Sequence, residues 1–348
     1  EFTQSFETGF QLGLYHNRVN LEVNYYNQVS NNQTIPLQTS NAAGISTLLT
    51  NAGEIKNSGV EVDLSLTPLI RIGQFRFDLS GNFSYQNSKV VNVQGGKQLL
   101  DQINFGTTNI GGIYAVAGKN YPELYVTDFN RDPNGHIIVD GTTGLPSINP
   151  NPVDAGNTNY KYFLGLSPAF YYKGFTLKAV FDYRGGAKIL NSVGNAMDFA
   201  GISTNDATNR QAFVIPNSVI QTGSKTFMPN TNVPITSGFG GLPVPIFWWA
   251  NFYNQVGMPY VTSADFWKLR ELVLSYDFPK SMLGSQKVFK ALTLAVTGRN
   301  LFMWRPKTNI WTDPEFSTNA TGNAVGYTTE YQTPPTRIIS GSLIVTIL

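Results

Sequence analysis

The strongest constraint on the fold is a two-residue alternation of apolar and polar side chains that returns along the whole chain. In residues 174–186, Phe175, Leu177 and Phe181 take one set of alternate positions, and Lys178 and Asp182 take the other. Side chains of a β-strand point in turn to its two faces, so this pattern predicts a strand with one apolar and one polar face. Nine such segments occur, at residues 5–15, 19–29, 59–67, 75–85, 162–173, 174–186, 266–278, 292–302 and 338–348. The fold class we expect is all-β and antiparallel.

The connections between these segments alternate between short and long. Short turns are expected at residues 15–18, 67–74 and 173–174, a connection of moderate length at residues 279–291, and long loops at residues 30–53, 88–160, 185–263 and 304–335. Strands of about 9–11 residues can cross a membrane, and transmembrane barrels place short turns on the periplasmic side and long loops outside. The pattern therefore predicts a transmembrane β-barrel whose apolar face meets lipid and whose polar face lines the lumen.

An odd number of strands leaves two open edges, which cannot stand in hydrocarbon. We therefore expect residues 1–348 to be the C-terminal portion of a larger barrel, with the other strands upstream or in another chain. The sequence contains no apolar run of about 18 residues, so it predicts no transmembrane helix.

The composition excludes several classes of function. Charged residues make up 13% of the chain and the net charge is +2, so no electrostatic binding of nucleic acid is expected. The chain has no cysteine, which excludes disulfides and thiolate chemistry. Its two histidines lie in a predicted turn (His16) and in a predicted surface loop (His136), and no catalytic set is recognisable. We predict that the protein is not an enzyme.

Five stretches resemble one family of membrane proteins. They are NAGEIKNSGVEVDLSL (residues 51–66), YKGFTLKAVFDYRGG (172–186), FWKLRELVLSYDFP (266–279), LTLAVTGRNLFMW (292–304) and PPTRIISGSLIVTIL (334–348). In this order they are similar to the C-terminal barrel of SusC/RagA-type TonB-dependent transporters. The NAGEIKNSGVE and GRNLF segments are the most specific.

The resemblance implies a 22-stranded barrel of which this chain supplies the last nine strands, without the plug, the TonB box and the N-terminal strands. It implies import of oligosaccharides or peptides across the outer membrane of a Gram-negative bacterium, driven by TonB. It also implies a SusD-like surface lipoprotein as a lid. Two other readings stay open: a secreted β-sandwich that binds glycans or acts as an adhesin, and a passive porin or siderophore receptor.

Three groups of residues are candidates for functional sites. Charged residues on the polar faces of the strands can line the path of the solute, or can pair with one another across neighbouring strands. These lumen-lining candidates are Glu22, Glu61, Asp63, Arg76, Asp78, Lys178, Asp182 and Arg184.

The second group is aromatic and lies in the long loop 185–263. Aromatic side chains can stack on sugars or peptide side chains or dock a lid, or can form the core of their own loop. The candidates for substrate or lid contact are Phe247, Trp248, Trp249, Phe252, Tyr253 and Tyr260.

The third group is a possible calcium loop in DFNRDPNGHIIVD (residues 128–140). Its oxygen-bearing residues are spaced like calcium ligands, but the glycine register of an EF-hand is shifted and a plain turn fits as well. The candidate ligands are Asp128, Asn130, Asp132, Asn134 and Asp140. No other cofactor is expected.

Overall fold

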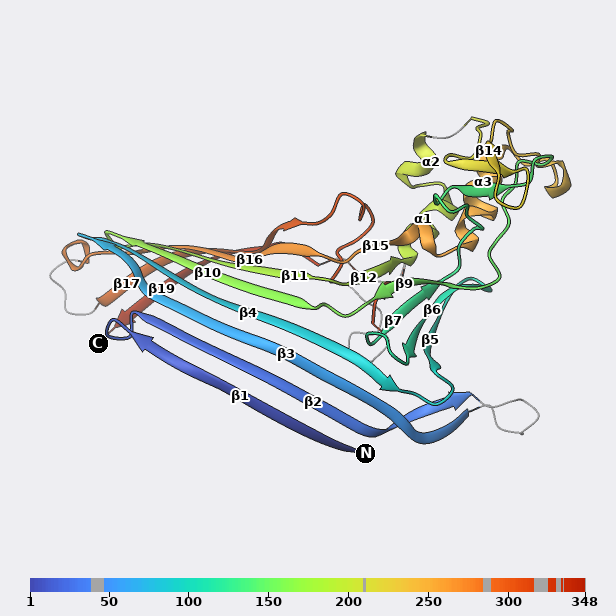
Figure 1. The fold of residues 1–348 in the computed structure, drawn as a ribbon. Helices are drawn as coiled ribbons and strands as arrows, with labels where there is room; N and C mark the ends of the chain where they lie inside the picture. Colours follow the sequence, from blue (N-terminus) through green and yellow to red (C-terminus); the bar gives the residue numbers. More distant parts are fainter. Residues whose placement is uncertain are drawn as a thin grey trace.

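A computed structural model describes residues 1–38, 47–208, 211–283, 289–315, 325–329, 333 and 335–347. Within this part, nine strands form one curved antiparallel sheet in the order β1-β2-β3-β4-β10-β11-β16-β17-β19 (Figure 1). Each of the nine predicted segments supplies one strand. The bounds are β1 Phe2–Leu14, β2 Val19–Gln38, β3 Thr47–Ile72, β4 Phe75–Asn92, β10 Tyr162–Tyr172, β11 Phe175–Gly185, β16 Phe266–Asp277, β17 Phe289–Trp304 and β19 Ile338–Ile347.

The register of the sheet sorts side chains into apolar and polar rows. One row of partners across eight strands is apolar throughout: Phe10, Val23, Val62, Phe83, Leu164, Tyr183, Trp267 and Trp304. The next row, on the other face, runs Gln11, Glu22, Asp63, Asn82, Gly165, Asp182, Lys268 and Met303. The apolar face is uncovered, since Phe10 is 56% exposed and Trp304 51%. The predicted two-faced sheet is therefore confirmed.

All short turns lie at one end of the sheet and all long connections at the other (Figure 1). Two expectations are corrected. The predicted loop 30–53 is mostly hairpin, because β2 continues to Gln38 and β3 begins at Thr47. The predicted turn 67–74 shrinks to Gly73 and Gln74, because β3 continues to Ile72 and β4 begins at Phe75.

The long connections are folded rather than irregular. We call residues 93–161 and 186–265 the insertion domain; it projects from the loop end of the sheet (Figure 1). One small sheet, β5-β6-β7-β9, contains β5 Lys97–Phe105, β6 Thr108–Val116, β7 Glu123–Val126 and β9 Val153–Asn157. A second, β14-β13-β8, contains β8 Ile137–Val139, β13 Ser218–Gln221 and β14 Phe227–Pro229. A third, β15-β12-β18, contains β12 Lys188–Asn191, β15 Val261–Ser263 and β18 Tyr327–Thr328.

Helices in the described residues are short: α1 Ser192–Ala200, α2 Thr204–Thr208 and α3 Val244–Asn251, with 3-10 turns η2 Ser237–Phe239, η3 Tyr253–Gln255, η4 Met258–Tyr260 and η5 Lys280–Met282. None of the described helices has the length and apolar character needed to cross a membrane.

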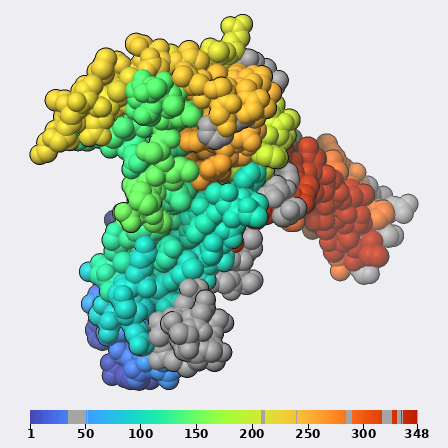
Figure 2. Space-filling view, turned by 90° about the vertical axis from the view of Figure 1, so that its right-hand side faces the viewer, coloured from blue at the N-terminus to red at the C-terminus, as the bar shows by residue number. Residues whose placement is uncertain are grey.

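The buried apolar core lies in the insertion domain rather than on the large sheet. One cluster joins Ile110, Leu124 and Tyr260, all fully buried, and another joins Phe129 and Trp248. Seen from the loop end, the N-terminal strands (blue) and the C-terminal strands (red) lie apart, with the insertion domain (green to orange) above them (Figure 2). In the part of the chain that the structure describes, no second sheet packs on either face of the large sheet, as expected for part of a barrel.

Candidate functional site: a charged network on the polar face

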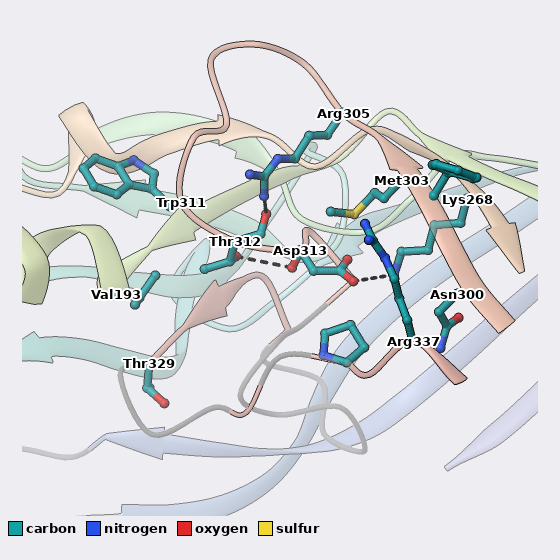
Figure 3. A pocket seen from close by; sticks show the side chains of 12 residues that line it. Val193, Lys268, Asn300, Met303, Arg305, Trp311, Thr312, Asp313, Thr329 and Arg337 are labelled. Carbon is teal, nitrogen blue, oxygen red and sulfur yellow. Dashed lines mark hydrogen bonds and ion pairs between the residues drawn. The ribbon is translucent and has the colours of Figure 1, made fainter. Parts of the chain in front are cut away.

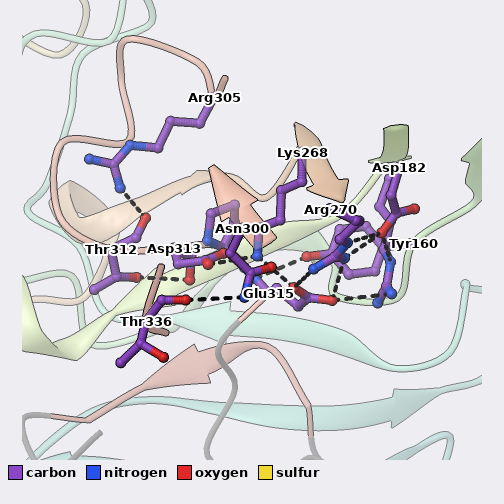
Figure 4. A network of polar contacts seen from close by, with 12 residues as sticks. Tyr160, Asp182, Lys268, Arg270, Asn300, Arg305, Thr312, Asp313, Glu315 and Thr336 are labelled. Atoms are coloured by element: carbon purple, nitrogen blue, oxygen red, sulfur yellow. Dashed lines mark hydrogen bonds and ion pairs between the residues drawn. The ribbon is translucent and has the colours of Figure 1, made fainter. Parts of the chain in front are cut away.

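The main polar feature is a network of six charged side chains where β11 and β16 approach the insertion domain (Figure 4). The guanidinium of Arg270 donates two hydrogen bonds of 2.7 Å, one to each carboxylate oxygen of Glu315. Its Nε donates to Asp182 at 2.9 Å. Strand alternation puts Arg270 on the same polar face as Lys268, and the pairing of β11 and β16 shifts at Arg270. Arg270 therefore links the sheet to the segment that contains Glu315.

Lys268 and Arg184 complete the network. Lys268 donates to Asp313 at 2.6 Å and to Glu315 at 2.5 Å, and only 6% of its side chain is exposed. Arg184 contacts Glu315 at 3.1 Å. Three cations thus face three anions, with Asp182 as the third carboxylate, and the burial of each charge is compensated by a partner.

The network lowers the pKa of Glu315. Burial alone would raise the pKa of this carboxyl group, but hydrogen bonds from Arg270 and Lys268 favour the ionised form more strongly and bring its pKa to about 2. Glu315 therefore stays ionised over the whole physiological pH range.

Asp313 and Glu315 belong to a segment that we call the strap, residues 305–315, which follows β17. Its Trp311 ring lies on Gly194 of α1, where a Cβ atom would come within 2.6 Å of the ring. Tyr160 donates to the carbonyl of Pro314 at 2.9 Å. The strap is thus held by ion pairs to the sheet and by its Trp311 ring to the insertion domain.

A cavity of about 420 Å³ lies between the strap and the ends of β17 and β19 (Figure 3). Its walls are largely apolar, and its polar lining consists of three cations, the carboxylate of Asp313 and three neutral side chains. The lining residues include Val193, Lys268, Asn300, Phe302, Met303, Arg305, Trp311, Pro335 and Arg337. An amphipathic anion would fit this chemistry better than a cation would.

A second polar cavity, of about 720 Å³, lies where β4 and β11 meet the insertion domain, and four lysines and three carboxylates line it. One of these carboxylates is Glu123 in β7, which is 5% exposed. Burial, with Asp154 nearby, raises the pKa of Glu123 to about 7 despite the opposing charge of Lys119. Glu123 is therefore a group that titrates near neutral pH.

The eight predicted lumen-lining residues all lie on the polar face of the sheet. Asp182 and Arg184 join the network, and Arg76 pairs with Asp78 through its Nε at 2.8 Å. Glu22 and Asp63 are direct cross-strand partners. The remaining members are Glu61 of β3, which pairs with Ser84, and Lys178 of β11, which pairs with Ala169. That this face lines the path of a solute stays a prediction.

The predicted aromatic contact surface is corrected by the structure. Phe247, Trp248 and Trp249 of α3 are at most 9% exposed, and Tyr260 is fully buried. These rings pack on one another and on Phe129. Phe252 and Tyr253 lie beside them, with Phe252 stacked on Phe129 at 5.9 Å between ring centroids. The rings therefore form part of the core of the insertion domain.

The predicted calcium loop does not bring free oxygens together. The guanidinium of Arg131 donates to both oxygens of Asp128, at 2.7 and 2.9 Å, and so already supplies a positive charge. Asp132 accepts from the backbone of Asn134 and from His136. Asp140 caps the turn at residues 142–143, and Asn130 donates to Ser147. Among the described residues no group of three His, Cys, Asp or Glu side chains can hold a metal ion. Calcium binding gains no support here and stays a prediction.

Four members of the network were missed as site residues: Lys268, Arg270, Asp313 and Glu315. Lys268 and Arg270 stand at alternate positions of a predicted strand, which is a signal that sequence reasoning could have used. Asp313 and Glu315 stand in a predicted loop, where no periodicity indicates a partner 45 residues away.

Comparison with known proteins supports the fold that the strands suggest. Residues 1–134 match the family model described as TonB dependent receptor-like, beta-barrel. The proteins TonB-dependent receptor P3 and TonB-dependent receptor P39 of Formosa agariphila are each 23% identical, over 86% and 85% of this chain. The chain spans about a third of the length of these curated relatives, 29% and 31%.

Solved structures of a transporter are similar over almost the whole chain. The structure of the RagAB peptide transporter covers 99% of this chain with a TM-score of 0.67 at 18% identity, and the match takes in 35% of that chain. The RagAB peptide importer in its closed-closed state covers 99% with a TM-score of 0.65 at 20% identity. At such identities the likeness establishes the fold, a partial barrel of a larger protein.

Proposed function

We propose that this chain, whose residues 1–134 match the barrel model of TonB-dependent receptors, forms the C-terminal wall of an outer-membrane importer of oligopeptides or oligosaccharides. The observation that carries this proposal is the pairing of an uncovered apolar face with a polar face of fixed charges. An apolar face that stays exposed suits lipid, and a charged face suits a wet lumen. The relatives are named as receptors and not as enzymes, in agreement with the absence of a predicted catalytic set.

In this proposal the gating role belongs to the loop end of the barrel. The insertion domain stands above the wall, and the strap ties it to the polar face through Lys268 and Arg270. A SusD-like surface lipoprotein would close on this end. Energy would come from TonB acting on parts of the receptor outside this chain, in the outer membrane of a Gram-negative bacterium.

The two other readings are weaker. A secreted β-sandwich requires the apolar faces to pack against each other, whereas Phe10 and Trp304 are more than half exposed. A passive porin would not be expected to match a TonB-dependent receptor model. The resemblance to RagAB, named a peptide transporter, favours peptides over siderophores as the substrate class.

Uptake by intact cells tests the proposal. Cells that produce the full-length receptor should accumulate a labelled oligopeptide or oligosaccharide pool. Deletion of the receptor gene or of tonB should abolish the accumulation. A surface lipoprotein should co-purify with the receptor from detergent-extracted outer membranes. Equal uptake with and without tonB would overturn the importer proposal, and a soluble product of this chain would overturn the barrel location.

A further inference from the structure

The apolar face of the large sheet has the height of a membrane's hydrocarbon layer at β4 and β10. In β10, which has 11 residues, this face runs from Tyr162 to Tyr172, and every side chain on it is apolar or aromatic. Tyr85 of β4 lies beside Tyr162, with their ring centroids 5.3 Å apart. A strand of this length, rising about 3.3 Å per residue and tilted by about 40°, spans roughly 25 Å, which is the height of the apolar band of an outer-membrane barrel. In the proposed barrel, the row of Tyr85 and Tyr162 therefore marks the outer edge of the lipid layer.

Two lysines stand on the same face beyond this row, where β3 and β4 continue toward the insertion domain (Figure 1). Lys56 of β3 and Lys89 of β4 are direct cross-strand partners, and both are exposed. They lie four residues beyond Val60 and Tyr85, which are also partners. Four residues of a tilted strand rise by roughly 10 Å, and the headgroup layer extends about 5–8 Å beyond the hydrocarbon. Because a lysine side chain is long and flexible, both ammonium groups can reach the lipid headgroups.

The pairing of these two lysines is unfavourable unless an anion lies between them. Like charges at directly opposed positions destabilise an antiparallel pair. Within the described part of the chain, neither Lys56 nor Lys89 forms an ion pair, and Glu54, two residues from Lys56, forms none with it. The neighbouring residues 39–46 carry no charged side chain. The two ammonium groups are therefore available to an external anion.

The cavity of about 720 Å³ lies next to this pair and has a polar lining. Lys89 lines it together with three asparagines, Asn87, Asn120 and Asn157. Four lysines and three carboxylates line it in all, so one positive charge is in excess when every group is ionised. Amide groups donate to and accept from hydroxyl groups, which suits a sugar better than an acyl chain. The cavity thus offers room for a sugar headgroup beside the lysine pair.

We propose that Lys56 and Lys89 bind the phosphate of a phosphorylated glycolipid in the outer leaflet, with its sugar in the cavity beside Lys89. Its acyl chains would lie on the apolar face below Tyr85. The inference rests on the proposed membrane location and adds a ligand outside the path of the solute. A phosphate has enough acceptor oxygens for both ammonium groups. A zwitterionic phospholipid carries its own ammonium group beside the phosphate, and the two lysines would repel that group.

Lipid binding to the purified full-length receptor tests the site by native mass spectrometry in detergent. The probes are diphosphoryl lipid A, phosphatidylethanolamine and inorganic phosphate. We expect lipid A to bind at least tenfold more tightly than phosphatidylethanolamine. The double variant Lys56→Gln/Lys89→Gln should weaken lipid A binding about 30-fold, since each lysine near an anionic lipid surface contributes about fivefold. The matched control Lys173→Gln/Lys290→Gln removes two exposed lysines at the turn end of the sheet and should keep the affinity.

Several outcomes would overturn the proposal. Equal affinity of the unaltered receptor for lipid A and phosphatidylethanolamine would exclude a phosphate-selective site, and equal losses in the two double variants would indicate general charge attraction. Inorganic phosphate that binds as tightly as lipid A would indicate a site for soluble anions. Should the double variant fail to assemble, Lys89→Gln alone should still lose about fivefold.

Failure of this site and failure of the proposed function have different signatures. A receptor that shows tonB-dependent uptake but no preference for lipid A would refute only the lipid site. A full-length receptor that is recovered as a soluble protein would refute the membrane location on which the inference rests.

Discussion

The guanidinium of Arg270 in β16 donates a hydrogen bond of 2.7 Å to each carboxylate oxygen of Glu315, although the two residues lie 45 positions apart in the chain. This contact holds the strap on the polar face of the sheet. Buried ion pairs are costly to break from one side, because the remaining charge has no partner. We therefore expect the strap to be destabilised by any substitution that removes one charged member of the network.

Replacement of Glu315 by Gln is expected to loosen the strap. Arg270 and Lys268 would both lose a charged acceptor, and breaking a buried pair from one side costs about 3–5 kcal/mol. Because Glu315 is 26% exposed, we expect about 3 kcal/mol, measured as faster hydrogen exchange of residues 305–315 in the full-length receptor. Glu271→Gln is the control, since its partner Arg299 is 61% exposed and such pairs contribute at most about 1 kcal/mol. Equal effects of the two variants would contradict the role of the network.

A side chain at Gly194 is expected to lift the strap from α1. In Gly194→Ala the new Cβ would lie 2.6 Å from Trp311, so the ring must shift, and overpacking of this kind costs about 1–3 kcal/mol. Gly238→Ala adds the same atom where nothing lies within 4 Å. Hydrogen exchange of residues 305–315 should rise in the first variant only. Unchanged exchange in both would show that Trp311 does not anchor the strap.

The aromatic cluster is expected to act through stability rather than through binding. Trp248 is 2% exposed, and removal of a buried aromatic ring costs about 3–5 kcal/mol. Trp248→Ala should therefore make the insertion domain sensitive to protease while the barrel stays heat-modifiable on gels. The matched variant Ile246→Ala, at a position 52% exposed on the same helix, should not. Loss of ligand binding with an intact, protease-resistant insertion domain would restore a contact role for Trp248.

Glu123 is expected to make the β5-β6-β7-β9 sheet weaken as pH rises. Its folded pKa of about 7 exceeds the unfolded value of about 4.5, so the folded state holds the extra proton. Stability from this group is present below pH 4.5 and is lost between pH 4.5 and 7, by up to about 3 kcal/mol. Hydrogen exchange of residues 123–126, corrected for its intrinsic pH dependence, should report the loss. Glu123→Gln should abolish this trend, and a trend that persists in the variant would assign it to another group.

Removal of divalent metal is expected to leave the turn at residues 128–140 unchanged. Both oxygens of Asp128 already accept from Arg131, so the turn has its positive charge without a metal ion. Proteolysis of this turn should be the same with calcium and with a chelator. Arg131→Met should instead increase cleavage, because Asp128, which is 5% exposed, would be left without its partner. Protection by calcium in the unaltered protein would contradict this and support the calcium prediction.

Residue patterns predicted the large sheet well because strand alternation is a local property. Each side chain from Phe175 to Arg184 points to a face set by its position in the strand, whatever lies elsewhere in the chain. The nine strands, their two faces and the sorting of turns to one end all follow from such local signals. The same reasoning placed Asp182 and Arg184 on the polar face.

The insertion domain and the strap depended on contacts between distant parts of the chain. Aromatic residues such as Trp248 and Tyr260 can stand equally well on an exposed loop or in a core, and only the packing of α3 on Phe129 decided for the core. The spacing of oxygen-bearing residues from Asp128 onward resembled a calcium loop, but it could not reveal that the guanidinium of Arg131 donates to both carboxylate oxygens of Asp128.

By itself, the sequence determined that this chain forms a two-faced antiparallel sheet with long connections at one end, since alternation acts within each strand. Only the tertiary structure decided that Glu315 meets Arg270 and that Trp311 lies on Gly194. The physical reason is that ion pairing and close packing depend on distances in space between residues that are far apart in the chain.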